Sequence, residues 1–243
     1  MRIKCRVEYI GTKYQGWQKQ PNGATVQSTI EDIFSKILNE VIIIHGSGRT
    51  DTGVHAKGQV FHFDASKNIA DLQSLKHSAN CLLPEDIKIL EIEEVKMDFH
   101  SRLSAKKKIY RYDLCLGECD VFSKPFCYEI NKPFSLEKFK KALSLFIGEH
   151  DFKNFTSKET DEARFIRNIE KIDIETNGNN VSVLFVGNGF MRYTIRYIIG
   201  TCVACAIGQT TLSSIEKLLK DSDRNIVSYK APAQGLFLVD VLY

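Results

Sequence analysis

A glycine-rich segment in the first half of the chain holds the residues best suited to chemistry. It runs from Gly46 to Ala56 as Gly-Ser-Gly-Arg-Thr-Asp-Thr-Gly-Val-His-Ala, with Arg49 two residues before Asp51. Glycines let a backbone approach a ligand closely, and a guanidinium beside a carboxylate keeps the carboxylate ionised. An ionised carboxylate held in place can act as a nucleophile. A surface turn with a capping aspartate also fits this composition, so the chemistry is a hypothesis.

Two well-known motifs overlap this segment, and each lacks a residue that it needs. Gly46-Ser47-Gly48 begins like a dinucleotide-binding G-x-G-x-x-G loop, but Asp51 stands where the third glycine belongs. Asp51-Thr52-Gly53 spells the aspartic-protease triplet, whose chemistry requires two carboxylates that share a proton. The chain has one copy, so the second carboxylate would have to come from a dimer partner. Both alternatives are disfavoured.

Basic residues gather at two other places. Arg192 and Arg196 are four residues apart, which in a helix places both on one face. Like charges there repel each other, so we expect an anionic group, either Asp51 or a bound phosphate, to compensate them. The second group surrounds a strand pattern that contains Tyr110, and its members are Arg102, Lys106, Lys107, Lys108 and Arg111. A phosphate-binding patch would be salt-sensitive, whereas a plain solvated surface is the alternative.

The elements that must hold these residues follow from periodicity. In the first half we expect strands at 2–10, 41–44, 59–63 and 87–95, helices at 25–39 and 70–82, and an irregular turn at 46–53. In the second half we expect strands at 109–116, 165–174, 181–186 and 236–243, with helices at 135–147, 190–207 and 213–220. Each half mixes strands with helices. The sequence therefore predicts an α+β fold of two domains, 1–104 and 105–243, with mixed or antiparallel sheets.

Composition limits the partners. The 243 residues are 43% hydrophobic and 26% charged, with a net charge of +3, which permits a polyanionic partner without requiring one. The N-terminal residues alternate, unlike an export signal, and the most apolar run, Ile198–Ile207, has about half the roughly 20 residues of a membrane span. We expect a cytoplasmic protein without membrane association. The seven cysteines lack paired zinc-site spacing, so we expect reduced thiols and no metal.

Six blocks of the sequence resemble motifs of the TruA-type tRNA pseudouridine synthases. The glycine-rich segment differs from that family's G-R-T-D-A-G-V-H-A only at Thr52. The other blocks are Tyr14–Gln18 with Thr25–Gln27, Phe99–Tyr112, His150–Phe155, Phe190–Gly200 and Ala231–Leu236. One block would be weak evidence, but six in the family's order are specific, and together they span nearly the whole chain.

The resemblance implies a substrate and a role for each of four residues. Asp51 matches the catalytic aspartate, Tyr110 the aromatic residue that stacks on the target base, and Arg196 the arginine that pairs with the aspartate. Arg49 matches the arginine that helps position a flipped nucleotide. The family isomerises uridines at positions 38, 39 and 40 of the tRNA anticodon stem-loop, as a homodimer without a cofactor. Its two α/β domains have sheets that join around a central catalytic cleft.

The chemistry agrees with these roles, because a uracil stacked in a helix must be flipped out before it can be turned and rejoined. The residues leave open whether Asp51 attacks C6 of uracil or C1′ of ribose. The chain departs from the family at Ile10 and at Tyr193-Thr194, where the family often has histidine or asparagine. These departures leave the choice of uridines open. A non-catalytic RNA-binding protein that acts as a tRNA-folding chaperone is the alternative.

Overall fold

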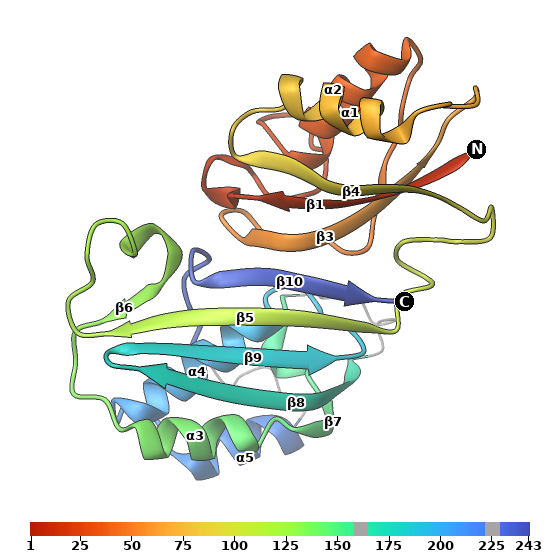
Figure 1. Ribbon diagram of the computed structural model, residues 1–243. Coiled ribbons are helices and arrows are strands. Elements are labelled where there is room, and N and C mark those ends of the chain that lie inside the picture. The colour runs from red at the N-terminus through yellow and green to blue at the C-terminus, as the bar shows by residue number, and fades with distance from the viewer. Residues whose placement is uncertain (158–164, 222–228) are drawn as a thin grey trace. The chain divides into compact units, whose positions relative to one another are not determined.

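The computed structural model describes residues 1–157, 165–221 and 229–243, and the chain forms two compact units. The first unit comprises residues 1–106 with 237–243, and the second comprises residues 107–236. Both units combine strands with helices, and strands pair in both directions (Figure 1). The α+β class predicted from the sequence is confirmed.

The first unit is built on an antiparallel core of three strands. β1 (Arg2–Tyr9) lies between β3 (His55–Asp64) and β4 (Ile87–Val95), the short β2 (His45–Gly46) pairs with β3, and β10 (Leu236–Leu242) runs parallel to β3. Alternate residues of β1 are buried, as the sequence pattern requires of a strand with one covered face. The helices α1 (Val26–Leu38) and α2 (Leu72–Leu82) cover that sheet (Figure 1), and a 3₁₀ turn spans Gly11–Lys13.

In its described residues, the second unit has a sheet of mostly antiparallel strands and three helices. β5 (Lys107–Leu116), β9 (Asn180–Gly187), β8 (Ile166–Asn177) and β7 (Gly148–Asp151) pair in that order, and β6 (Tyr128–Ile130) runs parallel to β5. α3 (Leu136–Ser144) packs against α4 (Thr194–Ala206) and α5 (Leu212–Lys220). Short 3₁₀ turns span Lys124–Phe126 and Lys153–Phe155. Nearly every residue of α4 is buried, so this helix is the core of the unit.

The strand predicted at 41–44 is wrong. Those residues form no strand, because side chains of α1 take the hydrogen bonds that a neighbouring strand would have used. The amide of Ile42 donates to Ser35 Oγ at 2.8 Å, and the amide of Ile44 donates to Glu31 Oε1 at 3.1 Å. The apolar pattern still describes burial, since Ile42 and Ile44 are buried while Val41 and Ile43 are exposed.

The helix predicted at 190–207 begins four residues later than expected. Tyr193 has a φ of 65°, in the left-handed region, and α4 starts at Thr194. Arg192 therefore lies before the helix, and the prediction that Arg192 and Arg196 lie on one helical face is wrong. The helix predicted at 135–147 is also shorter, since α3 ends at Ser144.

The C-terminal residues of the chain belong to the first unit. The sequence divides the chain after residue 104, whereas the compact units of the structure divide after Lys106 and return Phe237–Tyr243 to the first unit. The return follows from the parallel pairing of Phe237 with His55 and of Leu238 with Ala56. Within the described residues, no helix combines the length and hydropathy needed to span a membrane.

Candidate active site

The residue before Asp51 is fixed by its backbone and by its side chain. The Trp17 amide donates to the carbonyl of Thr50 at 3.1 Å, and the Thr50 hydroxyl is hydrogen-bonded to the buried Tyr9 hydroxyl at 2.8 Å. Gly16 has a φ of +85°, and a Cβ there would lie 2.7 Å from the Thr50 carbonyl oxygen. Gly16 and Trp17 therefore allow their own segment to lie against the backbone of Thr50, just before Asp51.

The residues after Asp51 are held by a second close approach. The Val54 amide donates to the Asp51 carbonyl at 3.1 Å, which closes the turn through Gly53, whose φ is +78°. A Cβ at Gly11 would lie 1.9 Å from the Val54 carbonyl oxygen. The Gly11 amide also donates to His55 Nδ1 at 3.1 Å, so the buried His55 has a structural contact four residues past the carboxylate.

The start of the loop is pinned by a buried glutamine of β3. Ser47 Oγ donates to Gln59 Oε1 at 2.6 Å, and Gln59 Nε2 donates to the Gly48 carbonyl at 2.9 Å. Both side chains are fully buried. Asp51 is therefore a half-buried residue on a loop anchored before, at and after its own position, which is the preorganisation that a reacting carboxylate needs.

Arg49 lies on the same loop, and its side chain is exposed. Its Nε donates to Gln18 Oε1 at 3.0 Å, which ties Arg49 to the segment that also supports Thr50. The structure thus places Arg49 and Asp51 on one anchored loop, as their spacing suggested.

Tyr110 is a nearly buried residue of β5 in the second unit. It pairs with Phe185 of β9, and its ring meets that of Phe190 at 5.3 Å with an interplanar angle of 79°. This edge-to-face contact fixes the orientation of the tyrosine ring.

Arg196 lies in the first turn of α4 and is clamped by the segment 229–232. Its Nε donates to the Ala231 carbonyl at 2.9 Å, and the Ala231 amide donates back to the Arg196 carbonyl at 2.9 Å. One turn further on, Gly200 has no room for a side chain, because a Cβ would lie 2.5 Å from the Tyr229 carbonyl oxygen. Burial raises the pKa of Tyr112, and the positive charge of Arg196 opposes that rise.

The basic group around Tyr110 carries less net charge than its sequence suggests. Lys107 Nζ lies 2.7 Å from Glu170 Oε2, and Arg111 Nη2 lies 2.8 Å from Asp113 Oδ2. Both cations are therefore paired with carboxylates. Arg102 and Lys106 are exposed.

The structure assembles three histidines that sequence spacing did not connect. The ring centroids of His45 and His62 are 5.1 Å apart, and those of His62 and His100 are 4.7 Å apart. Burial lowers the pKa of His62 to about 4, and nearby positive charges add to the effect. Nδ1 of His62 accepts the Ser101 amide and Nδ1 of His100 accepts the Arg102 amide, so the proton of each neutral ring is on Nε2. A metal ion could bind either ring through Nε2 only if that proton were removed.

Three cysteines also come together, between β5 and β6. Cys115, Cys119 and Cys127 are buried, and the sulfurs of Cys119 and Cys127 are 3.0 Å apart. Burial raises the pKa of Cys115 to about 11 and that of Cys127 to about 12, so both are thiols at neutral pH. In the part of the chain that the structure describes, no group of three or more potential ligands is arranged to hold a metal.

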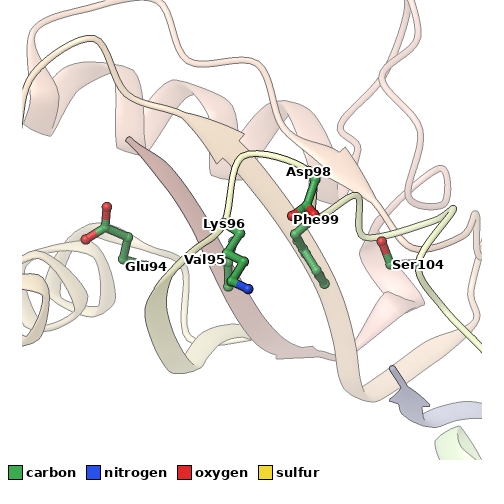
Figure 2. A pocket seen from close by; sticks show the side chains of 6 residues that line it. All are labelled: Glu94, Val95, Lys96, Asp98, Phe99 and Ser104. Atoms are coloured by element: carbon green, nitrogen blue, oxygen red, sulfur yellow. The ribbon is translucent and has the colours of Figure 1, made fainter.

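A shallow hollow of about 480 Å³ lies beside the end of β4 (Figure 2). It is lined by Glu94, Val95, Lys96, Asp98, Phe99 and Ser104, and none of the predicted site residues is among them. The hollow has the carboxylates of Glu94 and Asp98 but only one lysine, so it is unsuited to binding a polyanion.

Comparison with known proteins gives one consistent result. The family model described as tRNA pseudouridine synthase matches residues 6–103 and 142–243. Arg49, Asp51 and Arg196 lie inside the matched stretches, whereas Tyr110 lies between them.

Individual relatives match over nearly their full length. The tRNA pseudouridine synthase A 1 of Bacillus cereus is 38% identical over 244 residues, which cover 100% of this chain and 98% of the relative. The tRNA pseudouridine synthase A of a Geobacillus species is 39% identical over the same shares. That of a Thermoanaerobacter species is 35% identical over 238 residues, 98% of this chain and 97% of the relative.

Proposed function

Because this chain belongs to the tRNA pseudouridine synthase family and is an isomerase, we propose that it converts uridine to pseudouridine at positions 38, 39 and 40 of the tRNA anticodon stem-loop, with Asp51 as the catalytic nucleophile. The observation that carries the proposal is the loop of Asp51. Its neighbours Thr50 and Val54 are held by glycines that leave no room for a side chain, which is a costly arrangement for an ordinary surface turn.

The reaction conserves every atom of the nucleotide apart from exchanged protons. The bond between N1 of uracil and C1′ of ribose breaks, the base turns, and C5 bonds to C1′. The hydrogen of C5 leaves to water as a proton, and N1 gains one. Asp51 attacks either C6 of the flipped base or C1′ of its ribose, and both routes are chemically consistent with a held carboxylate. No electrons are gained or lost, so the proposed reaction needs no cofactor.

Three further residues have proposed roles on the flipped uridine. Tyr110 is proposed to stack on the base, which suits a ring whose orientation the Phe190 edge already fixes. Arg196 is proposed to keep the reacting carboxylate charged, since Ala231 holds the guanidinium at Nε. Arg49 is proposed to position the nucleotide.

Phosphate contacts are proposed for exposed basic residues. Arg102, Lys106 and Arg192 are exposed cations, and Lys108 is half-buried. Lys107 would first have to leave Glu170, because the two are paired at 2.7 Å. We also expect a homodimer in the cytoplasm, which light scattering and fractionation of cells would test.

Mapping the product tests the proposal. Unmodified full-length tRNA transcripts carrying uridine at positions 38, 39 or 40 are incubated with the enzyme, and pseudouridine is located by chemical derivatisation and mass spectrometry. Pseudouridine at these three positions is expected. Pseudouridine elsewhere in the tRNA would contradict the assigned positions. Binding without any product in a full set of tRNAs would favour the tRNA-folding chaperone.

A further inference from the structure

Tyr193 adopts a backbone conformation that its side chain disfavours. Its φ of 65° and ψ of 0° lie in the left-handed region, and among the described residues it shares a positive φ outside glycine only with Asn39. Asparagine tolerates this region, whereas a bulky side chain there is strained. Such a conformation persists only where the surroundings compensate for it.

The surroundings of Tyr193 are three cations at its ring. The guanidinium carbons of Arg192 and Arg196 lie 4.8 and 5.1 Å from the ring centroid, and Lys230 Nζ lies 4.6 Å from it. Arg192 Nη2 also donates to the Tyr193 hydroxyl at 2.9 Å. Cation–π contacts are favourable, so these three contacts offset part of the backbone strain. We call these four residues the Tyr193 cluster.

The rest of the fold holds the cations in place. Lys230 precedes Ala231, whose amide and carbonyl both bond to Arg196, so the lysine is fixed at the start of α4. Gly200 lets the same segment lie directly on the helix, since a Cβ there would be 2.7 Å from the Ala231 nitrogen. On the other side, Thr156 Oγ1 donates to the Arg192 carbonyl at 3.1 Å.

The cluster concentrates positive charge. A ring has two faces, so at least two of the three cations share one face, each about 5 Å from the same centroid. Three cations gathered at one ring offer several N–H donors to an anionic oxygen group that approaches them. Arginine forks and a lysine ammonium are the side chains that bind phosphate oxygens best.

We propose that Tyr193 is a positioning residue whose ring gathers Arg192, Arg196 and Lys230 into a binding site for a phosphate of the RNA backbone. The identity of the ligand rests on the proposed function, since it takes the phosphate from a tRNA substrate. The proposal adds two residues to the substrate site, Tyr193 and Lys230. It also accounts for the left-handed backbone conformation of Tyr193.

The test measures the salt dependence of tRNA binding for four variants of the full chain. Replacing Lys230 by glutamine should weaken binding several-fold and reduce the slope of log Kd against log salt concentration by about 1. Tyr193→Leu should weaken binding to a similar extent and raise KM more than it lowers kcat, because the cations lose their platform. Tyr193→Phe keeps the ring and should rescue most of the loss. Lys140→Gln is the matched control, since Lys140 is an exposed lysine of α3 outside the cluster.

The outcomes separate this proposal from the function on which it rests. A salt slope for Lys230→Gln equal to that of Lys140→Gln would overturn the phosphate site, as would wild-type behaviour of Tyr193→Leu. If Tyr193→Leu lowers the melting temperature severely, Lys230→Gln still tests the phosphate site, because Lys230 is exposed. Inorganic phosphate should compete with tRNA better than chloride does at matched ionic strength, and equal competition by the two anions would count against a phosphate site. Failure of the wild-type enzyme to form pseudouridine would count against the proposed function alone.

Discussion

Gly16 is the residue on which the position of Asp51 depends most directly. Its Cα faces the Thr50 carbonyl so closely that a Cβ would lie 2.7 Å away, and its φ is +85°. An added side chain must therefore displace the loop backbone that carries Asp51. Catalysis is sensitive to displacements of about 1 Å.

Gly16→Ala should therefore lower kcat by about 10²-fold while leaving tRNA binding nearly unchanged. Gly178→Ala is the control, because Gly178 also has a positive φ of +57° but has nothing within 4 Å of the added Cβ. Both variants carry about 1–2 kcal/mol of backbone strain, so their melting temperatures correct for it. Equal kcat for the two variants would contradict the role assigned to the close approach at Thr50.

His62 makes the stability of the first unit depend on pH. Burial lowers its pKa to about 4, from an unfolded value of about 6.5. His45, His100 and Arg2 add to the lowering, while Asp64 opposes it. The unfolded chain takes up the proton first, so the stabilisation is complete above about pH 6.5 and is lost as pH falls toward about 4.

We expect the free energy of unfolding to fall by on the order of 3 kcal/mol across this window, from 1.36 kcal/mol for each pKa unit. Urea denaturation at a series of pH values measures it. His62→Gln should flatten this part of the curve, and His77→Gln, on the exposed face of α2, should leave it unchanged. A curve that keeps its slope in His62→Gln would assign the pH dependence to other groups.

At the scale of elements, α1 stabilises the residues that follow it through buried side chains. Glu31 is 4% exposed, and its Oε1 accepts both Gln27 Nε2 at 2.9 Å and the Ile44 amide at 3.1 Å. Its Oε2 lies 3.1 Å from Lys19 Nζ. One carboxylate thus joins three segments and replaces the strand ladder that the pattern Val41–Ile44 predicts.

Replacing Glu31 by leucine should destabilise the chain by about 1–3 kcal/mol or more, because the buried Ile44 amide loses its acceptor. Asp32→Leu, at the next and exposed position of α1, should change stability by no more than about 0.5 kcal/mol. Denaturant unfolding compares the two. Equal effects would mean that Glu31 contributes no more than a surface residue.

The elements also show where periodicity succeeds and where it fails. Long amphipathic stretches such as 25–39 and 181–186 were predicted well, because one face of each is buried along its whole length. The start of α4 was predicted wrongly, since apolar and basic residues continue through 190–193 although the backbone turns at Tyr193. A pattern of side-chain types carries no information on a single φ angle, and a tyrosine gives no warning of a positive one.

At the scale of the whole molecule, sequence patterns identify residues better than they identify contacts. The Asp51 loop was found from its glycines and charges, but several of its supports come from Tyr9, Gly11 and Gly16, which are distant in sequence. The same holds for the ion pair of Lys107 with Glu170 and for the three clustered histidines. The pairing of β10 with β3 joins positions about 180 residues apart, which no local pattern can predict.

Tritium release tests whether Asp51 performs the proposed isomerisation of uridine in tRNA. A tRNA transcript labelled at C5 of uridine is incubated with the wild-type enzyme and with Asp51→Asn, and the label in water is counted, while tRNA binding is measured in parallel. Rejoining through C5 must expel that hydrogen, so the wild type should release label. Asp51→Asn should bind tRNA as well as the wild type but release label at least about 10³-fold more slowly. Release by Asp51→Asn at the wild-type rate would contradict the account.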